Sequence, residues 1–164
     1  MRYNKIRKMD IANGPGVRVS IFMQGCTFNC PGCFNPETHD FNGGQEFTTQ
    51  TIDKVLQLCA ADYIQGLSIL GGEPLHPQNI AGTTQLAQAF KQKFPQKTLW
   101  VWTGFLFEDL RDQAVFQYID VLVDGPFQTK LSNPMLKYQG SSNQRVIDVP
   151  QSLKSNKIVL WLEN

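Results

Sequence analysis

The chain has 164 residues, the length of one ordinary domain and fewer than the roughly 200 residues of a complete eight-stranded β/α barrel. A composition of 41% hydrophobic and 18% charged residues excludes a disordered, collagen-like or coiled-coil chain. The 15 basic and 14 acidic residues leave a net charge of +1, which disfavours nucleic-acid binding and a polybasic membrane anchor. With no signal peptide and no apolar run of ~18 residues, residues 1–164 are expected to form a single cytoplasmic domain.

Four runs rich in β-branched and aromatic residues, each followed by glycine or other turn residues, predict strands. In chain order they cover residues 18–23, 66–70, 98–102 and 121–123, and the apolar run 158–162 is a further strand candidate. Apolar residues at helical spacing predict helices over residues 51–60, 83–94 and 108–118, the first capped by Thr48 or Thr49. Strands that alternate with helices indicate an α/β fold with a mostly parallel sheet.

The ligands of such a sheet bind beyond the carboxyl ends of its strands. The cysteine segment and residues 71–74, 103–104 and 124–127 each directly follow a predicted strand, so we expect them to share one functional edge. Residues 128–150 carry turn chemistry and are expected to form an irregular excursion. A loop of that length inside a compact domain is usually functional or poorly ordered.

Three cysteines, Cys26, Cys30 and Cys33, form a C-x3-C-x2-C motif after the first predicted strand. A cytosolic chain of this size needs no disulfides, so close thiols indicate metal or redox chemistry. Three thiolates within eight residues can ligate three irons of a 4Fe-4S cube and leave the fourth iron without a protein ligand. Such an open position is typical of catalytic metal sites, whereas structural sites are closed.

Structural zinc is the main alternative for this triplet, with Cys59, His39 or His76 as the fourth ligand. Cys59 falls on the apolar face of a predicted helix, where a thiol usually behaves as a small hydrophobic residue. A structural role is the simpler interpretation of both histidines, and incidental cysteines are a third alternative. We therefore favour an iron–sulfur site.

A second motif, Gly71-Gly72-Glu73, follows the second predicted strand directly. Consecutive glycines let a ligand approach the backbone, and the Glu73 carboxylate can accept hydrogen bonds from a ligand ammonium. Alone, the motif predicts no more than a turn. Beside a cysteine loop with an open iron, it indicates a site for an amino acid-like cofactor whose amino and carboxylate groups chelate that iron.

Several longer segments carry a resemblance to a known family: residues 13–18, 25–35, 71–79, 100–104, 121–125 and 140–144. They resemble the radical S-adenosylmethionine enzymes and, within these, the activating proteins of anaerobic ribonucleoside-triphosphate reductases. The cysteine triplet is specific to the superfamily, and the Gly-Ser-Ser-Asn-Gln run at 140–144 is typical of the subfamily. The residue before the third cysteine is often aromatic in the superfamily but is Gly32 here, with the neighbouring Phe34 taking the packing role.

This resemblance implies that Cys26, Cys30 and Cys33 ligate a 4Fe-4S cluster whose fourth iron binds S-adenosyl-L-methionine. The residues implied to line that cofactor and to hold its methionine amino group are Gly32, Cys33, Phe34, Gly71, Gly72 and Glu73. The reduced cluster is implied to cleave the cofactor to a 5′-deoxyadenosyl radical, which takes a hydrogen atom from a glycine of the partner reductase and leaves a stored glycyl radical. No side chain is assigned as catalytic, because the cluster and the cofactor carry the chemistry.

The fold implied is a partial, open β/α barrel of the radical S-adenosylmethionine type, with one side left for the partner protein. The implied partners are the anaerobic reductase and a reduced flavodoxin- or ferredoxin-like electron donor. Thr103 and Asp124, at later strand ends, are weaker candidates for ribose or substrate contacts. The alternatives are activation of another glycyl-radical enzyme such as pyruvate formate-lyase, action on a small heterocycle, and a zinc-stabilised binding module without a reaction.

Overall fold

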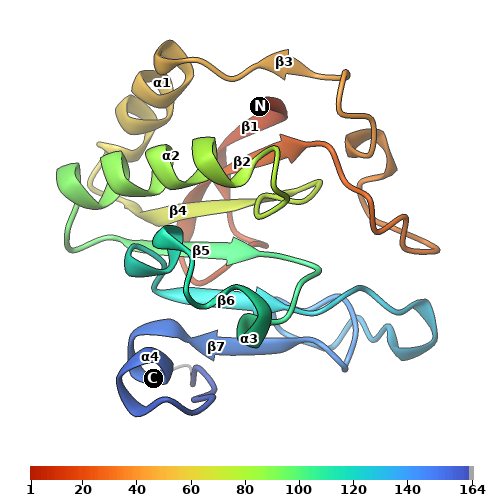
Figure 1. Cartoon of the computed structure of the whole chain (residues 1–164). Coiled ribbons are helices and arrows are strands. Elements are labelled where there is room, and N and C mark those ends of the chain that lie inside the picture. Colours follow the sequence, from red (N-terminus) through yellow and green to blue (C-terminus); the bar gives the residue numbers. More distant parts are fainter. Residues whose placement is uncertain (163–164) are drawn as a thin grey trace.

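Residues 1–162 are described by the structure, a computed structural model, and they form an α/β fold on one open seven-stranded sheet. The strand order is β3-β1-β2-β4-β5-β6-β7. The strand bounds are β1 Arg2–Asp10, β2 Val17–Gln24, β3 Gln45–Glu46, β4 Ile64–Gly71, β5 Thr98–Trp102, β6 Val121–Asp124 and β7 Arg145–Asp148. Strands β2, β4, β5 and β6 are parallel, whereas β1, β3 and β7 pair antiparallel at the two edges (Figure 1). The predicted α/β class with an open, largely parallel sheet is confirmed.

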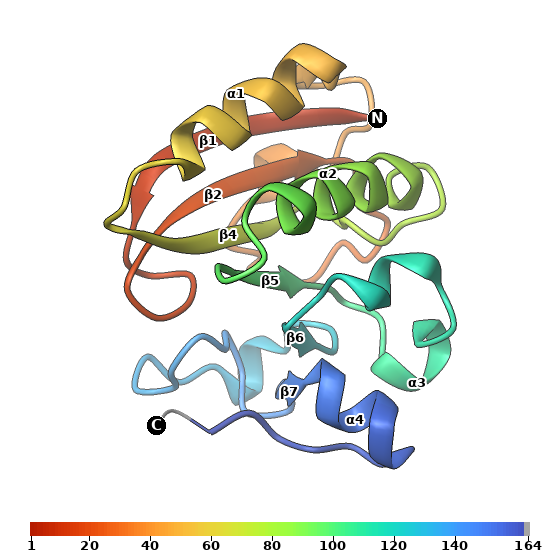
Figure 2. The same cartoon turned by 90° about the vertical axis from the view of Figure 1, so that its left-hand side faces the viewer.

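Helices cover one face of this sheet and enclose the main core. Their bounds are α1 Thr49–Cys59, α2 Ile80–Lys93, α3 Phe107–Leu110 and α4 Val149–Ser155. Figure 2 shows α2 and α3 on one side of the sheet and the segment that follows α4, up to residue 162, on the other. The strand residues that point to the helices, such as Ile21 and Leu67, are fully buried against Leu86 and Phe90 of α2. The helices predicted over 51–60 and 83–94 are confirmed as α1 and α2.

Helix α1 illustrates how local sequence sets an element and its inward face. It begins after Thr48, whose backbone N–H donates to Thr51 Oγ1 at 3.1 Å, in place of an intrahelical partner. Val55, Leu56 and Cys59 recur at helical spacing and are buried. Burial raises the pKa of the Cys59 thiol to about 12, so this cysteine remains a neutral apolar side chain.

The opposite face of the sheet is covered by residues from the last third of the chain. The rings of Tyr138 and Trp161 pack on the buried Trp100, with centroids 5.0 and 4.8 Å away. Nearer the carboxyl ends of the strands, Phe22, Leu70 and Trp102 on the same face line a cavity instead. The helix-free face is therefore the floor of the site described below.

The helix predicted over 108–118 is wrong, because the structure has only the short α3 followed by a 3₁₀ helix at Ala114–Gln117. Phe107 and Phe116 are both buried, and their ring centroids lie 5.6 Å apart. Nine residues make about two and a half turns of an α-helix, so a continuous helix would place these two rings on opposite faces. The break between the two segments lets both phenylalanines enter the core.

The strand predicted over 158–162 is also wrong. Only an isolated bridge joins Leu160 to Ile147, flanked by backbone hydrogen bonds of 2.9 Å from Trp161 N–H to Val146 O and from Asp148 N–H to Val159 O. Among residues 1–162, no helix is both long and apolar enough to cross a membrane.

The irregular excursion predicted over 128–150 ends earlier than expected. Its last part forms β7 and the beginning of α4, where Asp148 Oδ1 accepts a hydrogen bond of 3.0 Å from Gln151 N–H as an N-cap. Pro150 sits in the first turn of that helix, where its missing N–H costs nothing. Strand β1, in the polar segment before β2, was not predicted at all.

Candidate functional site

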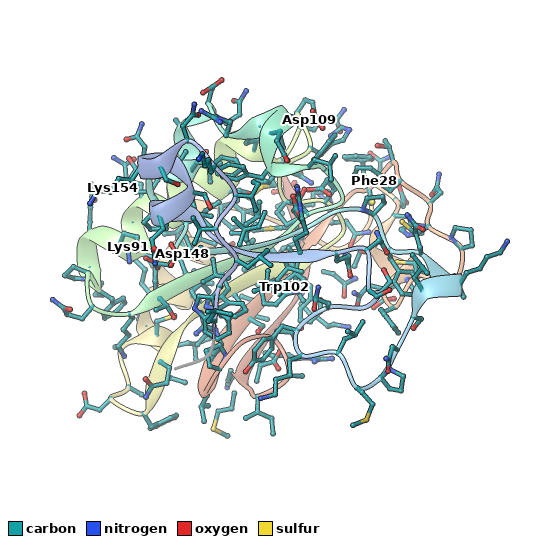
Figure 3. The ribbon with its side chains drawn as sticks, turned by 90° about the horizontal axis from the view of Figure 1, so that it is seen from below. Phe28, Lys91, Trp102, Asp109, Asp148 and Lys154 are labelled. Atoms are coloured by element: carbon teal, nitrogen blue, oxygen red, sulfur yellow. The ribbon has the colours of Figure 1, made fainter. Side chains whose placement is uncertain are left out.

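The loops that follow β2, β4, β5 and β6 surround one cavity of about 690 Å³. Figure 1 shows the loops after β2 and β6 leaving the sheet on the same side. Seen from below, Phe28 lies toward one end of the molecule, Lys91 and Asp148 lie toward the other, and Trp102 lies between them (Figure 3). Residues from all four loops line the cavity, among them Cys26, Cys33, Gly72, Glu73, Gly104 and Phe127. The expectation that these segments meet at one edge of the sheet is confirmed.

The cysteine loop is fastened at its root by backbone hydrogen bonds. Gly25 N–H donates to Thr38 O at 2.7 Å, and Cys26 N–H donates to His39 O at 3.1 Å. A further bond of 3.1 Å from Cys33 N–H to Cys30 O closes a turn between the last two cysteines. All three cysteines are free thiols, partly exposed, and all three line the cavity.

Each of the three sulfur atoms has a backbone N–H group nearby. Asn35 N–H donates to Cys33 Sγ at 3.4 Å, and the N–H groups of Phe28 and Phe127 are close enough to the Cys26 and Cys30 sulfurs to lower the pKa of these thiols. Burial raises the pKa of the Cys26 and Cys30 thiols above the ordinary value, an effect that these N–H groups partly offset. Without a metal the two groups are therefore held as thiols, and a bound cation would favour their thiolates.

Glu73 is the most enclosed acidic group of the cavity, with 1% of its surface exposed. Its Oε1 accepts hydrogen bonds from Leu75 N–H at 2.9 Å and Thr103 Oγ1 at 2.7 Å, and its Oε2 accepts one from Gly104 N–H at 2.7 Å. Burial raises the pKa of Glu73 to about 7 despite these three donors. A carboxylate has about four acceptor positions, so one remains on Oε2 for a cation in the cavity.

Gly71 and Gly72 bring the turn after β4 against the root of the cysteine loop. Gly71 has a φ of 106°, and a Cβ there would lie 2.7 Å from Met23 N. A Cβ on Gly72 would lie 2.6 Å from Gly25 O, next to the 2.8 Å hydrogen bond that Glu73 N–H donates to the same oxygen. Only glycines permit this approach, and it places the two predicted motifs side by side.

Phe34 and Gly32 complete the set of predicted cofactor residues, and both lie on the outer side of the cysteine loop. Phe34 is 69% exposed, lines the cavity and packs on the Phe127 ring, with centroids 4.9 Å apart. Gly32 has a φ of 72° and lies against Thr129. Phe127 falls within residues 124–127, which were expected at this edge, whereas Thr129 was not predicted, since no local motif marks it.

The weaker candidates Thr103 and Asp124 have partners within the protein. Thr103 donates to Glu73, as described, and accepts from Phe105 N–H at 3.1 Å. Asp124 is fully buried, accepts a hydrogen bond of 2.8 Å from Phe107 N–H, and pairs with Arg145, whose Nε lies 2.9 Å from its Oδ1. Both side chains therefore fix the geometry of strand ends.

Cys59, His39 and His76 were the fourth ligands considered for zinc. Cys59 is the last residue of α1 and points into the core. The His76 ring packs on Phe41, and its Nδ1 accepts a 3.2 Å hydrogen bond from Gln78 N–H. His39 does line the cavity, and its Nε2 is buried without a hydrogen-bond partner among the described residues. The structure thus brings one of the three beside the triplet.

The cysteine triplet fits an iron–sulfur cube by the chemistry of its donors: three soft thiol ligands on one open cavity, each supplied with an N–H. Within residues 1–162, no three His, Cys, Asp or Glu side chains are grouped to hold a single metal ion. A cube does not require that grouping, because its three thiolates bind three different irons.

Comparison with known proteins agrees with this chemistry. A family model described as a 4Fe-4S single cluster domain matches residues 12–147. The chain is 40% identical over 146 residues to the anaerobic ribonucleoside-triphosphate reductase-activating protein of Enterobacteria phage T4, covering 89% of this chain and 93% of that protein. It is 43% identical over 150 residues to the protein of the same name from Salmonella typhi, covering 89% and 97%. The Escherichia coli K12 protein of that name is 42% identical with the same coverage. The chain therefore belongs to the family of anaerobic ribonucleoside-triphosphate reductase-activating proteins.

Proposed function

We propose that this chain activates an anaerobic ribonucleoside-triphosphate reductase by installing a glycyl radical on it, with a 4Fe-4S cluster and S-adenosylmethionine as cofactors. The observation that carries the proposal is the placement of three free cysteines and the buried Glu73 around one open cavity at the strand ends. Membership of the activating-protein family supplies the identity of the protein substrate. Residues 1–164 act as a single domain in this proposal, a partial barrel of the radical S-adenosylmethionine type.

The cluster ligands in this proposal are Cys26, Cys30 and Cys33. Their loop is held at Gly25 and Cys26 by hydrogen bonds to the segment that follows it, so the three sulfurs keep their spacing without a disulfide. The N–H groups aimed at the sulfurs stabilise negative charge on a cluster. When bound and reduced, the cluster and S-adenosylmethionine supply a 5′-deoxyadenosyl radical that can take a hydrogen atom from a glycine.

The cofactor's methionine end is assigned to the turn at Gly71, Gly72 and Glu73. The free acceptor position of Glu73 suits an ammonium group, and the close approach of the two glycines leaves the backbone uncovered by side chains. Gly32, Cys33 and Phe34 are assigned to the side of the cofactor next to the cluster. Phe34 offers an exposed aromatic ring there, suited to an adenine.

The partner protein is assigned to the open side of the cavity. One lip of the cavity includes Arg7 and Ala12, and the other includes Ser132, Pro134 and further residues of the same exposed segment. Between the lips, the floor is apolar and aromatic, with Phe22 and Trp102. An extended glycine-bearing loop fits such a site better than a small polar substrate, which requires polar groups that converge from all sides.

The direct test mixes the reduced protein, S-adenosylmethionine and the reductase without oxygen, and records electron paramagnetic resonance for a glycine-centred radical. The electron donor is a reduced flavodoxin or ferredoxin, and the reaction is placed in the cytoplasm. Cys30→Ala is expected to abolish cofactor cleavage, and the matched control Cys59→Ala to retain it, because Cys59 is buried in the core.

Three results contradict the proposal and point elsewhere. A colourless protein with equimolar zinc after anaerobic purification identifies the binding module. A radical on pyruvate formate-lyase alone identifies a different partner. Absence of any radical, with an intact cluster and a competent reductase, excludes the activase function.

A further inference from the structure

Residues 126–144, which join β6 to β7, cross the cysteine loop; we call them the crossing segment. Near its beginning, Thr129 Oγ1 donates a hydrogen bond to Pro31 O, between the second and third cysteines. The Phe127 ring packs on Phe34. Thr129 also lies directly against Gly32, because a Cβ on Gly32 would be only 3.0 Å from Thr129 Oγ1. A segment remote in sequence therefore forms the outer wall of the cysteine loop.

This wall also reaches one of the three sulfurs. The N–H groups of Phe28 and Asn35, which serve Cys26 and Cys33, belong to the cysteine loop itself. Two N–H groups lower the pKa of the Cys30 thiol: that of Phe127, in the crossing segment, and that of Cys30 itself. The environment of Cys30 therefore depends in part on how the crossing segment is held, whereas that of the other two sulfurs is local.

One side chain holds the crossing segment at both ends. Gln144 Nε2 donates to Gly125 O at 2.9 Å, where the segment leaves the sheet. Gln144 Oε1 accepts from Gly140 N–H at 2.8 Å and from Ser141 N–H at 3.2 Å, where the segment returns. A single amide thus uses its donor and its acceptor to close a large loop that has little regular structure.

The returning end is pressed directly against the Phe127 ring. A Cβ on Gly140 would lie 3.0 Å from atoms of both Phe127 and Phe34, so the glycine backbone rests on the two rings. The buried Ser141 adds a hydrogen bond of 3.1 Å to its Oγ from Gln128 N–H, the residue after Phe127. Displacement of residues 140–141 therefore displaces Phe127.

We propose that Gln144 is a positioning residue for the cluster: it holds the crossing segment against the cysteine loop, through the Thr129–Pro31 hydrogen bond and the Phe127–Phe34 contact, so that the Phe127 N–H stays close to the Cys30 sulfur and raises the reduction potential. The inference rests on the proposed function, since it takes the cysteines to hold a 4Fe-4S cluster. An N–H donor on a ligating sulfur stabilises the more negative, reduced state, which is the state that delivers the electron. Under this proposal the Gly-Ser-Ser-Asn-Gln run influences the reduction potential of the cluster without contacting the cluster.

The experiment is a redox titration of the reconstituted full-length protein, with the electron paramagnetic resonance signal of the reduced cluster as readout. In Gln144→Ala the midpoint potential is expected to shift to a lower value, because both ends of the crossing segment are released. Gln144→Glu keeps an oxygen for Gly140 and Ser141 but loses the donor to Gly125 O, and a smaller shift in the same direction is expected.

Ser142→Ala is the matched control. It changes the same run of residues, but the Ser142 side chain is exposed and has no hydrogen bond among residues 1–162. If Gln144→Ala lowers stability too far for reconstitution, Thr129→Val is measured in its place. This variant removes only the exposed hydroxyl that holds Pro31 O, and the same downward shift is expected.

The inference is overturned if Gln144→Ala or Thr129→Val has the same midpoint potential as the wild type and Ser142→Ala. In that case the proposed function still stands, provided that the wild type contains iron and sulfide. A wild-type protein that binds no iron and sulfide overturns both. A loss of stability without a change in potential is the result expected of a purely structural glutamine, and it counts against the proposal.

Discussion

Replacing Glu73 with glutamine is expected to remove a pH dependence that this carboxyl group imposes on the stability of the fold. Glu73 is 1% exposed and has no cationic side chain among its hydrogen-bond partners, which are Leu75 N–H, Thr103 Oγ1 and Gly104 N–H. Burial of the charged form outweighs these three donors and raises the pKa of Glu73 from 4.5 to about 7. Glutamine has a similar shape and does not titrate.

The direction of the effect follows from the protons bound in each state. Between pH 4.5 and about 7, the unfolded chain has released the Glu73 proton while the folded chain retains it. The free energy of unfolding therefore falls as the pH rises through this window, and the loss is complete above it. At about 1.4 kcal/mol for each pKa unit, the loss amounts to about 3 kcal/mol.

The measurement is urea unfolding of the metal-free, reduced wild type and Glu73→Gln at a series of pH values from 4.5 to 8, followed by circular dichroism. The difference between the two proteins isolates Glu73, because the other titrating groups are common to both. Glu46→Gln is the matched control, since the Glu46 side chain is 80% exposed. A difference that stays constant to within about 0.5 kcal/mol from pH 4.5 to 7.5 would refute the reasoning.

Three further predictions concern different parts of the site. Arg145→Ala leaves the buried Asp124 without its cationic partner, and a loss of about 3 kcal/mol in the free energy of unfolding is expected by chemical denaturation. Gly72→Ala places a Cβ 2.6 Å from Gly25 O, and the iron and sulfide content after reconstitution is expected to fall while Gly82→Ala, on α2, retains it. Met135→Asp puts a charge on a side chain that is 86% exposed, between Pro134 and Leu136, which line the cavity; the affinity for the reductase is expected to fall about tenfold or more in a binding titration without loss of cluster.

The central part of the fold was predictable because its signals are local and strong. Strands β2, β4 and β5 are runs of apolar and β-branched residues that the sheet buries on both faces, and their boundaries follow glycine or turn residues. Strand β1 lacks that pattern: its side chains are mostly polar, and it is a strand because β2 and β3 pair with it. The helix expected over 108–118 failed because tertiary packing of two phenylalanines overrode a helical period.

The candidate site also has parts that local sequence predicts and parts that only tertiary contacts bring together. Cys26, Cys30 and Cys33 lie within one loop and are marked by their spacing. Gly71 to Glu73 lie within one turn, and they indicate a site only when considered beside the cysteines. The wall formed by Phe127 and Thr129 is different, because Thr129 and Pro31 are 98 residues apart in the sequence. No periodicity or spacing connects residues that meet only after the sheet has placed β2 and β6 in one layer, with two strands between them.

The site has an enclosed part and an exposed part, and the proposed function gives each a different role. Glu73, Thr103 and Asp124 are almost fully enclosed. Thr103 joins the turn after β4 to the end of β5, and Asp124 joins the end of β6 to the start of α3, so a ligand in the cavity would meet groups held in place by the fold itself. Residues 131–135 are exposed, yet the same segment continues through Gly140 and Gln144 to the rings beside the cysteine loop. In the proposed function, a protein substrate that contacts the exposed part therefore touches a segment whose other end packs on Pro31 and Phe34 of the cysteine loop. That continuity would let the enclosed half of the site hold the proposed cofactor while the exposed half receives the partner.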